Sequence, residues 1–128
     1  MPIVGQFGKL SGSITIAKGV PFNEFWEEDV APGSWISVYT VTVPSAIGAP
    51  SWYINCIHAT GRVHCRVKLT VGGVDKYVGR MNLVTMNLTD RFDDGEIVAA
   101  PGDAVELLVY HEWTELLVFS GNLSGYKR

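Results

Sequence analysis

Residues 35–43 read Trp-Ile-Ser-Val-Tyr-Thr-Val-Thr-Val, and this stretch decides the fold class. Apolar and polar side chains largely alternate with a period of two, and β-branched and aromatic residues dominate, as is typical of a strand with one buried face. The same alternation recurs along most of the chain. We therefore predict further strands at 52–59, 62–71, 74–78, 81–89, 103–111 and 114–120, the last extending towards Tyr126.

Turn signals separate these stretches. Gly72-Gly73, Asp93-Asp94-Gly95 and Pro101-Gly102-Asp103 each combine residues that favour tight turns. Short strands with a turn about every ten residues are typical of all-β proteins. We predict an antiparallel β-sandwich that is jelly-roll-like in its strand number and spacing, although an up-and-down or a Greek-key barrel fits the same pattern.

The size of the chain indicates a single domain, 1–128, because domains typically contain about 100–150 residues. Hydrophobic residues make up 47% and charged residues 18% of the chain, which excludes a disordered protein. No apolar run approaches the ~20 residues of a membrane-spanning helix, and the first residues lack the pattern of a signal peptide. We expect no membrane association and no secretion by a signal peptide. The glycines among residues 1–19 predict an extended N-terminal arm and an edge strand.

One segment, 20–30, departs from the strand pattern. Phe22, Phe25 and Trp26 stand at positions i, i+3 and i+4, after Pro21 and before a run of acids. This spacing predicts a short aromatic turn segment with a single turn of helix. The aromatic face could cover one end of the sandwich, or it could anchor the chain in a neighbouring copy.

Thr60-Gly61 predicts a two-residue hairpin turn, with glycine supplying a positive φ. The resulting register gives the hairpin one apolar face, which includes His58, and it places Cys56 directly opposite Cys65. This cross-strand pair could form a strained disulfide. Without an export signal, two reduced and buried thiols are the favoured state.

The histidines and acids form no catalytic or metal-binding pattern. His58 and His64 are predicted on opposite strand faces, and His111 lies near a later turn. The acids around Asp93 lack the spacing of a calcium loop. Motifs of serine hydrolases, phosphate-binding loops and zinc proteases do not occur in the sequence. We predict that the chain is not an enzyme and binds no cofactor or metal.

A basic face is the minimum requirement for binding nucleic acid. Arg62, Arg66 and Lys68 are predicted to share one hairpin face with Tyr53, which would place basic side chains beside an aromatic ring. The net charge of the chain is −3, so we do not expect nucleic acid as a partner. Basic residues predominate in 51–91 and acidic residues on either side, a distribution that could let copies of the chain attract one another.

The C-terminal strands predict a contact surface. If 103–111 and 114–120 form a hairpin across Glu112-Trp113, both faces of that hairpin are apolar. A sandwich strand needs only one apolar face, so the second must be covered by the arm, by segment 20–30 or by another copy of the chain. The candidate partner-contact residues are Phe22, Phe25, Trp26, Leu108, Tyr110, Leu117 and Phe119.

A glycine-punctuated arm, Met1–Gly19, and a closing strand pair at Pro101-Gly102-Asp103 complete the pattern. With these features the chain resembles, as an architecture over its whole length, the jelly-roll decoration or cement proteins of tailed-phage capsids. The resemblance implies a non-enzymatic virion protein that is assembled in the host cytoplasm. It also implies a homo-oligomer, with a trimer favoured, that binds and stabilises the shell of a major capsid protein through the arm and the apolar hairpin face.

The alternative function is a carbohydrate-binding or receptor-binding β-sandwich module. The four tryptophans and five tyrosines could supply platforms for stacking against sugars. Trp35 and Trp52 lie on strand faces predicted to be core, which leaves Trp26 and Trp113 as the exposed candidates.

Overall fold

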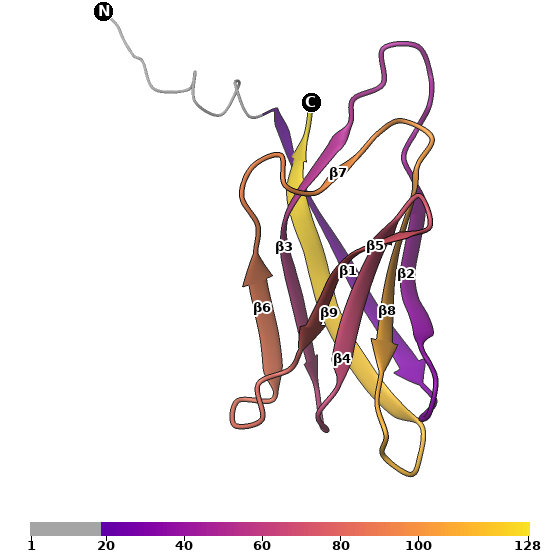
Figure 1. Ribbon diagram of the computed structural model, residues 1–128, viewed down its shortest axis with the longest axis vertical. Coiled ribbons are helices and arrows are strands. Elements are labelled where there is room, and N and C mark those ends of the chain that lie inside the picture. The colour runs from indigo at the N-terminus through magenta and orange to yellow at the C-terminus, as the bar shows by residue number, and fades with distance from the viewer. Residues whose placement is uncertain (1–18) are drawn as a thin grey trace, which may run out of the picture.

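The computed structural model describes residues 19–128, which form two antiparallel β-sheets packed face to face (Figure 1). Within this range no helix is long and apolar enough to cross a membrane. The predicted arm, 1–19, lies outside the described residues except for Gly19. The strands are β1 (Val20–Val30), β2 (Ile36–Thr42), β3 (Trp52–Gly61), β4 (Arg66–Val71), β5 (Val74–Arg80), β6 (Asn87–Arg91), β7 (Val98–Ala99), β8 (Ala104–Tyr110) and β9 (Leu117–Lys127).

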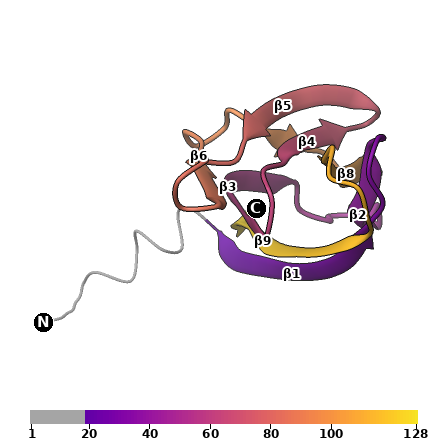
Figure 2. The same ribbon diagram turned by 90° about the horizontal axis from the view of Figure 1, so that it is seen from below.

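The strand order identifies the sandwich as a jelly roll. One sheet has the order β1-β9-β3-β6, with the short β7 also pairing to β3, and the other has the order β2-β8-β4-β5. Apart from the β4–β5 hairpin and β7, successive strands alternate between the two sheets, as in a double-sheet jelly roll. Seen end-on, β1 and β2 lie at one flank, and β5 and β6 lie at the other (Figure 2). The predicted antiparallel sandwich is confirmed, and two separate sheets exclude an up-and-down barrel.

Two predicted hairpins are wrong, because each would join strands that lie in different sheets. β3 pairs with β6, β7 and β9, whereas β4 pairs with β5 and β8. β8 and β9 likewise belong to opposite sheets. Thr60-Gly61 therefore ends a strand and forms no turn. Gly61 is needed for another reason, since a Cβ atom at this position would lie 2.2 Å from the Phe119 ring of β9.

A β-bulge in β3 reverses which side chains of this strand face the core. The register with β9 shifts just after Ile54, so Ile54 and Ile57 are both buried although they are three positions apart. His58 was predicted on the apolar face, but the bulge places it on the outer face. There its Nδ1 lies 2.9 Å from Thr89 Oγ1 on β6.

Residues 20–30 form strand β1, so the predicted helical turn is wrong. β1 pairs with β9 along its whole length. Phe22, Trp26 and Val30 are buried in the core, whereas Phe25 is 76% exposed. Positions four residues apart share a face in a helix and also in a strand, so the spacing of Phe22 and Trp26 suited both structures.

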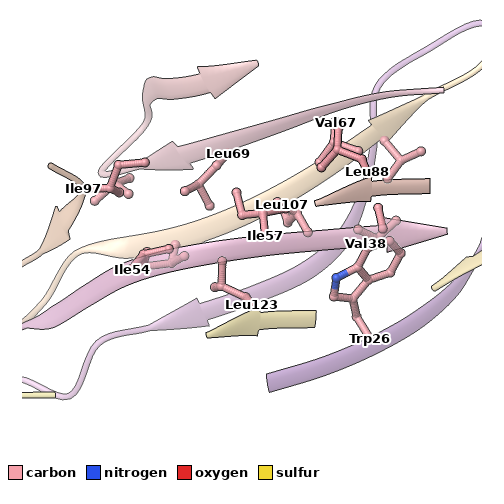
Figure 3. Packing of buried hydrophobic residues seen from close by; sticks show 14 of the residues in the cluster. Trp26, Val38, Ile54, Ile57, Val67, Leu69, Leu88, Ile97, Leu107 and Leu123 are labelled. Carbon is pink, nitrogen blue, oxygen red and sulfur yellow. The ribbon is translucent and has the colours of Figure 1, made fainter. Parts of the chain in front are cut away.

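The hydrophobic core fills the space between the two sheets (Figure 3). Ile54, Ile57 and Leu123 of one sheet and Leu69 and Leu107 of the other are completely buried. Truncating a buried side chain of this size typically costs about 2–5 kcal/mol. Packing between the sheets therefore supplies the main stabilisation of the fold and fixes the positions of the connections at either end.

Candidate functional site

A cleft of about 770 Å³ lies at one end of the sandwich, within the range of about 300–1,000 Å³ that is common for small-molecule sites. It is lined by the β3–β4, β5–β6 and β8–β9 connections and by the adjoining strand ends. This is the lower end of the molecule in Figure 1, opposite the end where the first residue of β1 pairs with the last residue of β9. We call this site the loop-end cleft.

Three arginines, Arg62, Arg66 and Arg80, line the loop-end cleft. Arg66 on β4 and Arg80 on β5 are direct partners in the strand ladder. In the described part of the chain none of these arginines forms an ion pair, because both ion pairs found there involve other residues. Like charges on directly opposite positions destabilise a sheet. The cleft therefore concentrates positive charge, with three arginines against the single carboxylate of Glu112, which forms an ion pair with none of them.

Aromatic rings accompany these cations. The guanidinium carbon of Arg66 lies 4.9 Å from the centre of the Tyr110 ring and 5.8 Å from that of Trp35. The Nζ atom of Lys68 lies 4.7 Å from the centre of the Trp35 ring. Cation–π contacts at such distances are attractive and keep both cations against the sheet surface. Trp35 and Lys68 lie beside the cleft, whereas Trp113, which is 55% exposed, lines it.

The cleft also contains hydrogen-bonding groups other than arginine. The Tyr110 hydroxyl donates to Glu112 Oε2 at 2.8 Å, and this bond raises the pKa of Tyr110 against the opposing effect of Arg66. The Nε2 atom of His64 is buried and has no hydrogen-bond partner among the described residues. Unpaired buried polar atoms are rare in folded proteins, so His64 marks a position where a ligand or water can form a bond.

His111 positions the β8–β9 connection. Its ring is 1% exposed, and its Nε2 lies 2.7 Å from the carbonyl oxygen of Val30, which can only accept a hydrogen bond. Nε2 therefore carries the proton. The free lone pair of Nδ1 accepts the backbone N–H of Trp113 at 3.2 Å. A neutral imidazole thus satisfies both contacts and ties the loop that bears Trp113 to the end of β1.

The two cysteines do not form the predicted pair. Cys56 lies opposite Arg91 and Ser124 on its neighbouring strands, whereas Cys65 precedes β4 in the other sheet. Both cysteines are free. Cys65 lines the cleft, but burial raises the pKa of its thiol to about 12. At neutral pH it is a protonated thiol and a weak nucleophile.

The candidate partner-contact residues separate into three groups. Three are buried in the core of their own chain: Phe22, Trp26 and Phe119. Leu117 is half-buried against that core. The predicted two-faced hairpin does not form, because β8 and β9 lie in opposite sheets. Phe25 is exposed. Two others project from the outer face of β8 and are half-buried there: Leu108 and Tyr110.

The tryptophans and the predicted basic face also need correction. Trp52 is buried and Trp113 is exposed, as predicted. Trp26, predicted to be exposed, is buried, and Trp35, predicted in the core, lies against cations at the surface. Tyr53 belongs to the other sheet and contacts Arg128, so it does not share a face with the arginines of β4.

No group of three or more His, Cys, Asp and Glu side chains within residues 19–128 is arranged to hold a metal ion. The sequence matches no protein-family model and no curated protein.

Proposed function

We propose that this chain is a non-enzymatic structural protein that assembles with copies of itself and decorates a virus capsid. The role in the virion follows from the resemblance of its architecture to capsid decoration proteins. The observation that supports self-assembly is the opposite charge of the two flanks of the sandwich.

One flank is acidic. β1, an edge strand, carries Glu24, Glu27, Glu28 and Asp29 and no basic residue, and its neighbour β2 carries no charged residue at all. The exposed Phe25 lies among these acids. We call β1 and β2 the acidic flank.

The opposite flank, formed by β5 and β6, is basic in sum. These two strands carry three basic residues, Lys76, Arg80 and Arg91, and two aspartates. One of the aspartates, Asp90, accepts a hydrogen bond from Tyr77. Val74 and Val78 of β5 are more than half exposed. We call β5 and β6 the basic flank.

A contact between the acidic flank of one copy and the basic flank of the next would bury Phe25 against the exposed valines and pair the opposite charges. It would also cover edge strands, whose free backbone groups are prone to pair with another chain. Such a head-to-tail contact uses two different surfaces, and it closes into a ring when the rotation between copies permits. Complementary charge would steer the copies into this orientation.

Charge reversal tests the contact. Glu27→Lys/Glu28→Lys should dissociate the oligomer into folded monomers, and Lys76→Glu/Arg91→Glu should do the same. Mixing the two variants should restore association in assemblies of alternating variants, because each then meets a surface of opposite charge. Such assemblies contain an even number of copies if they close, so a closed trimer should not return. Glu96→Lys/Glu115→Lys changes the net charge by the same amount at loop positions and should leave the oligomer intact.

Light scattering coupled to size-exclusion chromatography gives the mass in each case. An oligomer that survives both reversals would show that the flanks are not the interface. Association with a shell is measured separately, by co-sedimentation of the purified protein with undecorated phage capsids.

A further inference from the structure

We propose that the loop-end cleft binds an acidic saccharide, a sugar chain that carries carboxylate groups. This inference does not depend on the proposed role in the capsid, since it rests on the cleft alone. The cleft lies at one end of the sandwich, away from the acidic flank, and it shares only Arg80 with the basic flank.

The arginines indicate an anionic ligand. Arg66 and Arg80 are held side by side by the β4–β5 register, and Arg62 lines the same cleft from the β3–β4 connection. A guanidinium presents a planar fork of donors that matches a carboxylate and binds it with two parallel hydrogen bonds. A bound carboxylate would also relieve the repulsion between Arg66 and Arg80. The geometry therefore favours a carboxylate between these two side chains.

The remaining lining indicates that the ligand also has hydroxyl groups. Glu112 carries a carboxylate at the cleft and accepts the Tyr110 hydroxyl, and the buried Nε2 of His64 has no partner among the described residues. Glu112 can accept a hydrogen bond from a sugar hydroxyl, and either tautomer of His64 can bind one, because a hydroxyl both donates and accepts. Because the Glu112 carboxylate repels other anions, we expect the carboxylate of the ligand to bind at the arginines and a hydroxyl group to bind at Glu112.

The aromatic groups provide the apolar surface that one face of a sugar ring requires. Trp113 is 55% exposed at the cleft, and Tyr110 and Met86 line it as well. Sites of this kind combine apolar and aromatic walls with a few polar groups that fix orientation. The hydrogen bond from the Trp113 backbone N–H to His111 positions the Trp113 loop before a ligand binds.

Titration with trigalacturonate, followed by tryptophan fluorescence and calorimetry, tests the proposal. We expect saturable binding that weakens as sodium chloride is raised, and much weaker binding of the methyl ester of the same trisaccharide, which keeps the hydroxyls and loses the charge. Sialyllactose serves as a second acidic saccharide of different geometry. The proposal is supported if either acidic saccharide binds and if its binding requires the carboxylate.

Variants locate the site. Arg80→Gln and Arg66→Gln should each lower the affinity by about tenfold or more, the usual consequence of losing hydrogen bonds to a charged group. Arg128→Gln removes the same charge at a residue that is neither in the cleft nor on either flank, and it should leave the affinity unchanged. Circular dichroism and thermal unfolding show whether each variant is folded, and Trp113→Ala gives a second test if an arginine variant does not fold.

Three results would overturn the proposal. The first is that neither acidic saccharide binds at millimolar concentration. The second is that the methyl ester binds as well as the acid, and the third is that Arg128→Gln has the same effect as Arg80→Gln. Stronger binding of hexaglutamate or of oligothymidylate than of the saccharides would also overturn it and assign the cleft to a protein or a nucleic-acid partner.

Discussion

The hydroxyl group of Tyr77 on β5 donates a hydrogen bond to the carboxylate of Asp90 on β6, and this bond joins the two sheets at the basic flank. At the acidic flank the same arrangement recurs, because Tyr39 on β2 donates to Glu24 Oε1 on β1 at 3.2 Å. Burial is the main cause of a raised pKa for both phenols, and the neighbouring carboxylates raise it further. Each flank is thus closed by a tyrosine that must remain protonated.

Stability at alkaline pH follows from these two tyrosines. The pKa of Tyr77 is higher in the folded protein than the value of 10.0 that it has in the unfolded protein. Below pH 10 this difference does not affect the free energy of unfolding. Above pH 10 the unfolded protein loses the proton first, so the free energy of unfolding falls as the pH rises. Tyr77→Phe should lower the free energy of unfolding at pH 7 by about 1–2 kcal/mol, because Asp90 loses its partner. The difference between wild type and variant should shrink above pH 10. Urea unfolding at pH 7 to 11 measures both effects, and a constant difference would contradict the account.

Gly61 is predicted to be required by the Phe119 ring. Gly61→Ala places a Cβ atom where the ring lies, and overpacking of this kind typically costs about 1–3 kcal/mol. In a Phe119→Leu background the same substitution should cost much less. A double-mutant cycle of unfolding free energies measures this coupling. Additive effects would mean that Gly61 is needed for its backbone freedom instead.

Cys65 is predicted to be chemically inert in the folded protein. Its thiol is 1% exposed and its pKa is raised to about 12, whereas Cys56 is half-buried. Treatment with iodoacetamide at pH 7.5 should therefore modify Cys56 first and modify Cys65 only after unfolding. Peptide mass spectrometry distinguishes the two sites. Rapid modification of Cys65 without denaturant, or loss of both thiols in the absence of reductant, would contradict this placement.

His111 is predicted to hold the loop of Trp113. His111→Leu leaves the Val30 carbonyl and the Trp113 N–H without their partner and should cost about 1–3 kcal/mol in unfolding free energy. Amide hydrogen exchange at Trp113 should accelerate in this variant more than exchange in the core of β8. His64→Leu, in the same cleft, serves as the control and should leave exchange at Trp113 unchanged.

The sequence was sufficient to predict the fold class but not the strand neighbours. Alternation correctly indicated a strand at 35–43, and Gly72 and Gly73 both adopt the positive φ that their turn requires. Three other predicted strands began too early, because 62–65, 81–86 and 114–116 belong to the connections before β4, β6 and β9. The strands on either side of Thr60-Gly61 each have one apolar face. Two such strands can pair side by side in one sheet, or they can pack against each other from two sheets. The alternation pattern is the same in both cases, so it does not predict which strands are neighbours.

The loop-end cleft was not predicted, because it depends on a register shift and on connections between the two sheets, which sequence patterns do not reveal. A two-residue turn at Gly72-Gly73 alone would place Arg66 opposite Gly79. A register shift after Leu69 places it opposite Arg80 instead, and this brings two cleft arginines together. Trp113 was identified as exposed, but its place beside the arginines depends on connections between sheets that no local pattern predicts.

The mass of the intact chain in solution shows whether the protein assembles with copies of itself. Light scattering on the purified protein across micromolar concentrations, at low and at high salt, requires no ligand and no partner. We expect a stable oligomer of three times the 14.0 kDa mass of one chain, and we expect it to dissociate more readily as salt screens the charges of the flanks. A folded monomer of 14.0 kDa under all of these conditions would contradict the assembly of this protein through its oppositely charged flanks.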